Sequence, residues 1–531
     1  MSGGSFSKVG VVGLGTMGAG IAEVLARGGL AVVGIEINQE ALDRGRGHLE
    51  GSTGRAVKRG RLTAEAQREI LDRIVLSTDF ADLGDCDLVI EAVPERLDLK
   101  RRVFERLDEV CRADAVLATN TSSLSVTDIA VTTGRPAKIV GVHFFNPAPV
   151  MKLVEVIGTV LTEDGAVARV ADLVEGLGKT PVTVGDRAGF VANRLLFGYL
   201  NQAATMLGSG HATRDDIDTA MKVGGGLPMG PFTLMDLIGL DTCLEVLEAV
   251  YRESRDRRHA PAPVLRELVT AGLLGRKTGR GFYSYDTSAP EAEAADAEAS
   301  RPVLGVLGDG AEAVALVAAA AGAGGEVRHL ADDASALTDL AGCALIIEAG
   351  TGDAAARTAL LEKAAQAAGP GAVLATTSAA VPVIEAAMAT GRPADVVGLH
   401  LPEPGGPLAE VVATVATGPD VADRAAAHAA ALGLTPVRCR DRAGFIVDAL
   451  RFPYLNDAAA MLGAGYADAD SIDAAMTLGC GYPTGPVADL DRLGLDRAVT
   501  VLRALYAESR EPALSPAPLL EEHVTAGRTL R

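Results

Sequence analysis

The sequence predicts an α/β domain built on a mainly parallel sheet, then an all-helical domain, and then a reduced second copy of both. Three observations support this prediction. Apolar runs of strand character alternate with helical segments over the first 186 residues, as they do in α/β domains. A glycine-rich turn joins the first of these runs to a helix. Whole motifs of the first half return in the second half.

The first strand is expected over Val9 to Leu14, where it runs into a glycine-rich motif at 13–18 that opens a helix. A GxGxxG motif in this position is typical of a Rossmann-type dinucleotide site. Its first glycine permits the tight turn, its second lets the backbone approach a pyrophosphate, and its third lets the helix pack on the strand. The predicted cofactor contacts in this motif are Gly13, Gly15, Thr16, Met17 and Gly18.

The second strand, Ala31 to Ile35, ends at Glu36, where a carboxylate can bind the ribose 2′-hydroxyl of a dinucleotide. The same carboxylate would repel a 2′-phosphate, so we expect NAD rather than NADP. Residues 39–79 then show the pattern of two helices, which form an arm on the sheet domain.

A further strand, Leu88 to Val93, precedes Pro94-Glu95, where a helix running through Lys100 is expected to begin. Strand ends in open α/β sheets face the ligand crevice, which makes Glu95 and Lys100 candidate neighbours of the cofactor. A solvated helix start is an equally open interpretation of both residues.

The candidate catalytic groups follow two more strands. The run 115–118 leads into a hydroxyl-rich turn at 119–123, and the run 138–142 leads into His143. Glu155 lies twelve residues after the histidine, inside the next apolar run. A buried carboxylate can orient an imidazole and stabilise its protonated form, so the pair suits proton transfer. Beside a dinucleotide site, this pair predicts an alcohol dehydrogenase.

Other polar groups are expected to converge with this pair where the sheet domain meets the helices. Ser122 lies in the hydroxyl-rich turn, and Asn193 stands at the start of the helical domain. Since an isolated histidine is more often structural than catalytic, we assign His48, His211 and His259 to the surface or the core.

A basic cluster in the arm has two open interpretations. From Arg44 to Arg61 the chain carries six Lys or Arg residues against one acid, Glu50. The cluster is either a solvated helix face or a site for a ligand with phosphates at its far end, such as coenzyme A. With the latter, the substrate would be an acyl thioester.

The composition narrows the class of protein. A formal charge of −20 over 531 residues argues against binding to nucleic acid or an anionic membrane, since both need a basic surface. The six cysteines show no CxxC or zinc-type spacing, which indicates reduced thiols, no metal site and a cytoplasmic protein. No signal-peptide pattern is expected at the N-terminus. The longest uncharged run, 313–325, is shorter than the roughly 20 residues that span a bilayer.

The second half repeats the first, most closely in its helical part. The motif Asp-Arg-Ala-Gly-Phe at 186–190 returns at 441–445, and three further motifs keep this offset of 255. The glycine turn and His143 also return, at Gly308 and His400, with offsets of 295 and 257. The difference means that most of the arm was deleted from the second copy.

These repeats predict five segments: 1–186 for the Rossmann-type domain with its arm at about 39–79, 187–286 for the helical domain, 287–301 for a linker rich in Ala, Glu, Asp and Pro, 302–440 for a degenerate sheet domain, and 441–531 for a second helical domain. The second copy keeps His400 and Glu410. However, Ala379, Glu403 and Asp448 stand where the first copy has Ser122, Asn146 and Asn193. We therefore expect no catalysis in the second copy.

Seven motifs between residues 8 and 285 form one constellation: GLGTMG at 13–18, NTSSL at 120–124, HFFNP at 143–147, LVEV at 153–156, FVANR at 190–194, AMK through PMGPF at 220–232, and KTGRGFY at 277–283. Together they resemble the L-3-hydroxyacyl-CoA dehydrogenase family, in its long two-copy bacterial form. The resemblance implies NAD-dependent oxidation of (S)-3-hydroxyacyl-CoA to 3-ketoacyl-CoA, and the reverse.

The resemblance also implies roles for residues. His143 would be the base and Glu155 its partner, with Ser122 and Asn193 on the substrate oxygen. The implied contacts of NAD are Glu36, Glu95, Lys100, Ser122, Asn146 and Lys277, and those of coenzyme A are Ser52, Lys58 and Arg59. The implied substrate is short-chain 3-hydroxybutyryl-CoA, or alternatively 3-hydroxyadipyl-CoA of phenylacetate degradation. Because family members pair through their helical domains, the second half is expected to act as an internal partner. A monomer and a homodimer of two-copy chains both stay open.

Two other functions stay open as well. One is a dehydrogenase of free β-hydroxy acids, against which the basic arm argues. The other is a non-catalytic regulator that binds NAD or acyl-CoA. The intact set Ser122, His143, Glu155 and Asn193 argues against the regulator.

Overall fold

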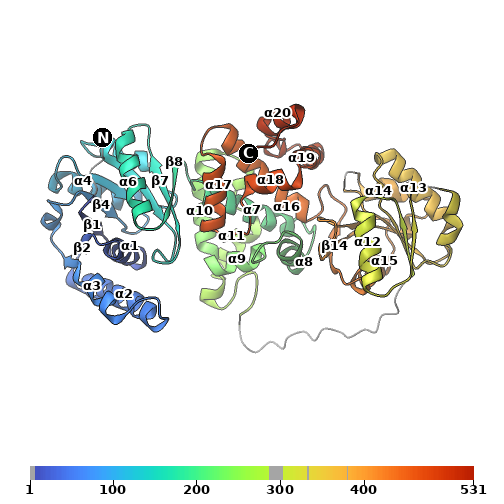
Figure 1. Ribbon diagram of the computed structural model, residues 1–531, viewed down its shortest axis with the longest axis horizontal. Helices are drawn as coiled ribbons and strands as arrows, with labels where there is room; N and C mark the ends of the chain where they lie inside the picture. Colours follow the sequence, from blue (N-terminus) through green and yellow to red (C-terminus); the bar gives the residue numbers. More distant parts are fainter. Residues whose placement is uncertain (1–5, 286–302, 332–333, 380) are drawn as a thin grey trace.

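The structure, a computed structural model, describes residues 6–285, 303–331, 334–379 and 381–531. Its two sheet domains lie at opposite ends of the molecule, and its two helical domains pack together between them (Figure 1). The linker expected over 287–301 lies outside the described residues.

The first sheet has the strand order β3-β2-β1-β4-β5-β6-β7-β8 in the part of the chain that is described. Among the described strands, β6 and β7 form the one antiparallel pair, and all other neighbouring strands are parallel. The strands are β1 (Lys8–Val12), β2 (Ala31–Ile35), β3 (Ile74–Ser77), β4 (Leu88–Glu91), β5 (Val116–Thr119), β6 (Ile139–Phe144), β7 (Leu153–Gly158) and β8 (Thr180–Gly185). Their central members are buried apolar runs, as expected for a parallel sheet with helices on both faces.

The helices of this domain are α1 (Thr16–Arg27), α2 (Gln39–Lys58), α3 (Ala64–Asp72), α4 (Leu97–Val110), α5 (Val126–Ala130) and α6 (Asp164–Gly176). The two helices predicted over 39–79 are confirmed as α2 and α3, which project as an arm below the sheet in Figure 1. The same segment also supplies β3, which the sequence pattern did not reveal. That strand is only four residues long and follows α3 almost directly, so its apolar residues do not stand out from the helical pattern before them.

The first helical domain contains α7 (Ala192–Gly208), α8 (Arg214–Thr219), the π-helical turn η3 (Ala220–Gly224), α9 (Pro231–Ile238), α10 (Leu240–Ser254) and α11 (Pro263–Thr270). Its counterpart contains α16 (Val447–Gly463), α17 (Ala469–Ala474), the π-helical turn η8 (Ala475–Gly479), α18 (Pro486–Leu493), α19 (Leu495–Ser509) and α20 (Pro518–Ala526). None of the helices in the described ranges is both long and apolar enough to cross a membrane.

The second sheet has the order β10-β9-β11-β12-β13-β14-β15 over the residues described. Its strands are β9 (Leu304–Leu307), β10 (Val327–Leu330), β11 (Leu345–Glu348), β12 (Val373–Thr376), β13 (Val396–His400), β14 (Leu408–Ala413) and β15 (Thr435–Arg440), and its helices are α12 (Ala311–Gly322), α13 (Ala354–Ala367), α14 (Val383–Ala389) and α15 (Val421–Ala431). It has the same order as the first sheet without the β3 edge and without the arm. The predicted duplication with a reduced second sheet domain is therefore confirmed.

The two helical domains pack on each other through equivalent surfaces. Helices α7 and α16 lie against each other, and the rings of the equivalent residues Tyr199 and Tyr454 have centroids 6.4 Å apart. Gln202 on α7 donates to the carbonyl of Ala449 on α16 at 2.8 Å. A single apolar core includes buried residues of both domains, so the halves form one folded unit.

Candidate active site

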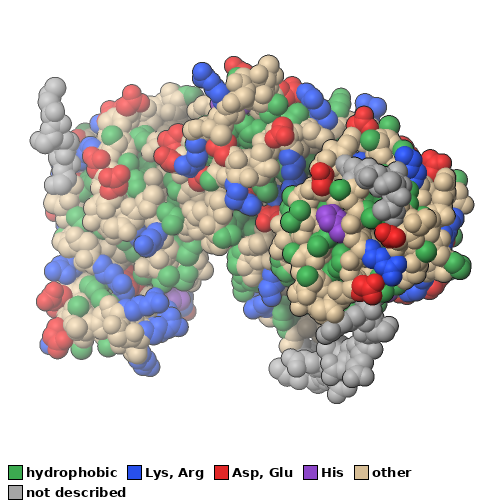
Figure 2. Space-filling model, turned by 45° about the vertical axis from the view of Figure 1, so that its right-hand side comes forward, with side chains coloured by type: hydrophobic (Ala, Val, Ile, Leu, Met, Phe, Trp, Pro, Cys, Tyr) green, Lys and Arg blue, Asp and Glu red, His purple; other side chains and the backbone are tan. Residues whose placement is uncertain are grey.

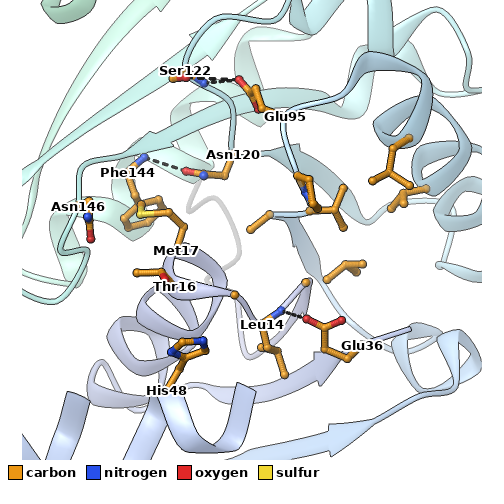
Figure 3. A pocket seen from close by; sticks show the side chains of 18 of the residues that line it. Leu14, Thr16, Met17, Glu36, His48, Glu95, Asn120, Ser122, Phe144 and Asn146 are labelled. Carbon is orange, nitrogen blue, oxygen red and sulfur yellow. Dashed lines mark hydrogen bonds between the residues drawn. The ribbon is translucent and has the colours of Figure 1, made fainter. Parts of the chain in front are cut away.

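A cavity of about 1000 Å³ lies at the carboxyl edge of the first sheet, where the strand ends of an open α/β sheet form a ligand crevice. Figure 3 shows the side chains that surround it. The predicted site residues on its wall are Gly13, Gly15, Thr16, Met17, Glu36, Glu95, Ser122, His143, Asn146 and Asn193. Asn193 and Thr242 belong to the helical domain, so the cavity lies between the two domains.

The glycine-rich turn has the geometry that a dinucleotide site requires. Gly13 has φ = +89°, and a Cβ there would come within 3.0 Å of the backbone of Ala92. A Cβ on Gly18 would stand 1.8 Å from the carbonyl oxygen of Gly13. A Cβ on Gly15, by contrast, would have no described atom of another segment within 4 Å, which leaves room for a pyrophosphate at the start of α1.

Glu36 lies on the wall of the cavity directly after β2. Its Oε1 accepts a hydrogen bond from the backbone N–H of Leu14 at 2.6 Å, as Figure 3 shows. The carboxylate is thereby fixed beside the glycine turn, where it can bind a ribose diol. The turn, the open space at Gly15 and this carboxylate fit an NAD molecule.

His143 and Glu155 are directly opposite each other on the antiparallel strands β6 and β7. Nδ1 of His143 lies 2.7 Å from Oε2 of Glu155, whose side chain is fully buried. The histidine reaches the cavity wall, so Nε2 is the ring nitrogen that is left for a ligand. The cross-strand register therefore produces the dyad that the sequence predicts.

The second oxygen of Glu155 binds the start of the helical domain. Oε1 accepts hydrogen bonds from the backbone N–H groups of Val191 and Ala192, both at 3.1 Å. These N–H groups are among the first of α7, which have no partner within the helix, so the carboxylate caps the start of the helical domain. The same contact brings Asn193, in the first turn of α7, to the cavity.

Glu95 holds the turn that carries Ser122. Its Oε1 accepts hydrogen bonds from Thr121 Oγ1 at 2.5 Å and from the backbone N–H of Ser122 at 2.9 Å. Burial acts to raise the pKa of Glu95, but the charge of Lys100 and these hydrogen bonds outweigh it and lower the pKa. Helix α4 begins at Leu97 and not at Pro94-Glu95 as expected, since Glu95 lies in the preceding loop and holds this turn.

Lys100 lies behind the cavity wall and not on it. Its side chain is fully buried, with Nζ 2.9 Å from Glu91 Oε1 and 3.4 Å from Glu95 Oε2. Nζ also donates to the carbonyl of Asn120 at 3.0 Å. Direct contact of Lys100 with the cofactor stays a prediction, since its ammonium group is here surrounded by Glu91, Glu95 and the carbonyl of Asn120. Lys100 supports Glu95 and Asn120, which are on the wall.

Other predicted contacts also lie outside the cavity lining. Gly18 is buried within α1, and Nζ of Lys277 pairs with Asp241 at 2.5 Å, next to the cavity residue Thr242. Ser52, Lys58 and Arg59 lie further along the arm and do not line the cavity.

The arm meets the cavity through Arg44 and His48 of α2. Arg44 belongs to the basic cluster that the sequence shows, whereas the exposed His48 was not among the predicted site residues. With Ser52 they are spaced four residues apart, so all three share one helix face. This spacing is the signal that could have identified them. Lys and Arg side chains gather over the arm, at the lower left of Figure 2, and the exposed ones are Arg44, Arg46, Arg55, Lys58, Arg59, Arg61 and Arg68.

Asn120 and Phe145 are two further wall residues that were not predicted as site residues. The Oδ1 of Asn120 accepts a hydrogen bond from the backbone N–H of Phe144 at 3.0 Å, which ties the turn after β5 to the end of β6. The ring of Phe145 packs against His143 with centroids 4.4 Å apart. Both residues lie beside predicted ones in the sequence, but only the packing reveals their contacts.

Two protein-family models each match this chain twice. The family model of the 3-hydroxyacyl-CoA dehydrogenase NAD binding domain matches residues 8–187 and 272–442. The family model of the 3-hydroxyacyl-CoA dehydrogenase C-terminal domain matches residues 189–285 and 444–531.

Individual relatives match either the whole chain or its first half. The chain is 35% identical to 3-hydroxyadipyl-CoA dehydrogenase of Escherichia coli over 97% of this chain and 96% of that protein. It is 46% identical to a probable 3-hydroxybutyryl-CoA dehydrogenase of Deinococcus radiodurans over 52% of this chain and 100% of that protein. A crystal structure of 3-hydroxybutyryl-CoA dehydrogenase from Escherichia coli K12 matches with a TM-score of 0.77 and 32% identity, covering 98% of this chain and 99% of that one. The chain therefore belongs to the 3-hydroxyacyl-CoA dehydrogenase family and is an NAD-dependent oxidoreductase that contains both domains of the family twice.

Proposed function

We propose that the first copy oxidises the 3-hydroxyl group of a short-chain (S)-3-hydroxyacyl-CoA and catalyses the reverse reduction. The observation that carries this proposal is that His143, on the wall of the dinucleotide cavity, lies 2.7 Å from the buried Glu155. Ser122 and Asn193 line the same cavity, so a substrate oxygen can meet a base and two hydrogen-bonding groups together.

In this proposal Nε2 of His143 removes the proton from the 3-hydroxyl group, because Nδ1 is held by Glu155. The Glu155 carboxylate stabilises the imidazolium that forms. Ser122 and Asn193 hold the substrate oxygen in place. NAD, when bound, accepts the hydride from C3. In the reverse direction, His143 returns the proton to the oxygen of the 3-keto group as that group is reduced.

The names of the relatives and the basic arm support an acyl-CoA substrate. The relative that matches over the whole length is named for 3-hydroxyadipyl-CoA, and several that match the first half are named for 3-hydroxybutyryl-CoA. We propose 3-hydroxybutyryl-CoA as the substrate and 3-hydroxyadipyl-CoA as the second candidate. The exposed basic side chains along the arm, including Lys58 and Arg59, can bind the phosphates of coenzyme A. A free hydroxy acid has no phosphates and would not need them.

The test is NADH oxidation with acetoacetyl-CoA, beside NADPH and beside a His143→Ala variant. We expect NADH to be oxidised and the variant to lose the activity. Neutralising Lys58 and Arg59 should weaken activity on thioesters, whereas an unaffected thioester activity would favour a dehydrogenase of free acids. A protein that binds NADH but reduces no 3-ketoacyl-CoA, including dicarboxylic ones, would instead support the non-catalytic regulator.

We also propose that the enzyme works in the cytoplasm. The second half, in this proposal, takes the place of a partner subunit. The shared apolar core of the helical domains supports an internal partner. A chain that ends at residue 286 would expose this core and should self-associate or aggregate. A truncated chain that stayed soluble, monomeric and fully active would contradict the internal-partner proposal.

A further inference from the structure

The second copy reaches the catalytic pair of the first through one close contact. The turn η8 packs on β7, the strand that carries Glu155. At Gly479, the last residue of this turn, an added Cβ would stand 2.6 Å from Cδ2 of Leu153 and 3.3 Å from Cε1 of Phe145. The absence of a side chain at Gly479 is what lets the turn lie against both residues.

Phe145 also contacts His143. Its ring lies against the imidazole, with centroids 4.4 Å apart and planes inclined by 48°. Phe145 is half-buried, lines the cavity and directly follows the end of β6. Its ring therefore lies next to both the turn of the second copy and the imidazole.

The equivalent contact in the opposite direction is incomplete. Gly224, at the end of η3, lies against Leu408 of β14, and an added Cβ would stand 2.3 Å from Cδ2 of Leu408. The residue at the position of Phe145, however, is Pro402. The aromatic ring that lies against His400 is Phe445, with centroids 5.2 Å apart, and it corresponds to Phe190 of the first copy. In the described residues, an aromatic ring thus lies between η8 and His143, whereas no equivalent ring lies between η3 and His400.

We propose that the second copy is part of the working active site: its Gly479 keeps Phe145 packed against the imidazole of His143 and so acts as a positioning residue for proton transfer. The inference rests on the proposed function and gives the second half a role beyond that of a packing partner. A displaced Phe145 would let the imidazole rotate on its Glu155 hydrogen bond and would change its contact with water.

The test compares Gly479→Ala with Gly224→Ala in the full-length chain. Both substitutions insert the same methyl group at equivalent turns, and the clash is at least as close at Gly224. We expect Gly479→Ala to lower kcat for acetoacetyl-CoA reduction by about 10- to 100-fold, because small misplacements of reacting groups cost factors of this order. It should also shift the pH profile of kcat and leave the affinity for NADH unchanged. Gly224→Ala should retain the wild-type kcat and pH profile.

Two further variants distinguish positioning from simple loss of stability. Leu153→Val removes the Cδ2 atom that clashes, so it should restore part of the kcat of Gly479→Ala. Phe145→Leu leaves the turn untouched and should shift the pH profile in the same direction as Gly479→Ala.

The inference is overturned if the two alanine variants change kcat alike, or if Gly479→Ala lowers only the melting temperature. An unchanged pH profile in Phe145→Leu would overturn it as well, even if Gly479→Ala did not fold. The proposed function fails in a different way, through a wild-type protein that binds NADH and reduces no 3-ketoacyl-CoA.

Discussion

The histidine–glutamate pair has almost the same geometry in the two copies. Nδ1 of His143 lies 2.7 Å from Glu155, and Nδ1 of His400 lies 2.6 Å from Glu410. In both copies the pair bridges two antiparallel strands. In both, the second carboxylate oxygen accepts two backbone N–H groups at the start of the next helix. The pair thus joins a sheet domain to a helical domain whether or not it works as a catalyst.

The surroundings of the second pair differ from those of the first. Asp448 stands in the place of Asn193, with one oxygen 3.9 Å from Nε2 of His400. Arg497 pairs with the buried Asp448 at 3.0 Å and also donates to the carbonyl of Pro402 at 2.9 Å. An ion pair therefore occupies the side of the imidazole that would have to meet a hydroxyl group.

The glycine turns of the two copies also differ in the free space beside them. A Cβ on Gly310 would stand 2.7 Å from the side chain of Thr351, whereas the equivalent space at Gly15 is open. Ala331 takes the place of Glu36 after the second strand. The comparison teaches that the dyad keeps its geometry where the groups around it have changed, so the surroundings of the pair, and not its geometry, distinguish the two copies.

The largest expected difference between the copies is in the histidines. Replacing His143 by Ala should lower kcat/KM for acetoacetyl-CoA by about 10² to 10⁴-fold, since a positioned general base contributes typically this much. His400→Ala should leave the activity per folded chain unchanged. Steady-state NADH oxidation by the two variants measures both effects. A comparable loss in His400→Ala would mean that the second copy takes part in the chemistry.

The second-largest expected difference between the copies is in their affinity for NADH. Glu36→Gln should weaken NADH binding by about 10- to 100-fold, because hydrogen bonds to a charged group contribute about 1.5–3 kcal/mol. It should also reduce the preference for NADH over NADPH. Fluorescence titration checks both affinities and the stoichiometry, for which we expect one NADH per chain. A second equivalent of similar affinity would contradict the interpretation of the turn at Gly310.

The ion pair of the second copy can be tested through stability. Arg497→Ala leaves the buried Asp448 beside His400 without its strongest partner. Because Arg497 itself is about a third exposed, we expect a loss of about 1–3 kcal/mol in the free energy of unfolding, less than for a fully buried pair. Urea denaturation measures it, with Thr242→Ala, the equivalent substitution in the first copy, as the control. If both variants were equally stable, the ion pair would not be what holds the second site closed.

The smallest expected effect concerns pH. Burial acts to lower the pKa of His400, but the hydrogen bond and charge of Glu410, with Asp448 and Glu312, outweigh it and raise the pKa above 6.5. A raised pKa in the folded state means that this histidine adds stability below pH about 6.5, and that the contribution is lost as the pH rises through the folded-state pKa. Thermal unfolding across this range should show a decline that His400→Gln reduces. The exposed His48, replaced by Gln, is the control, and an equal change there would contradict the assignment.

Much of this molecule follows from local sequence patterns. The turn at Gly13 to Gly18, the strand that ends before Glu36 and the duplication at an offset of 255 were predicted from the sequence, and the fold contains them. The pairing of His143 with Glu155 was predictable too, because two consecutive apolar strands place their residues in register. The turn, the strand and the pair depend on backbone geometry or on neighbours that are close in the chain, and the duplication is read directly from repeated motifs.

Tertiary structure decided which side chains reach the cavity. Lys100 follows a strand end as Glu95 does, yet packing encloses Lys100 behind the wall and brings in Arg44 and His48 from the arm. The sequence likewise contains Gly479 and Phe145 more than 300 residues apart, without any pattern that connects them. Periodicity and motifs specify local conformation, whereas contacts between distant segments depend on how whole domains pack, and that packing sets the surroundings of the catalytic histidine.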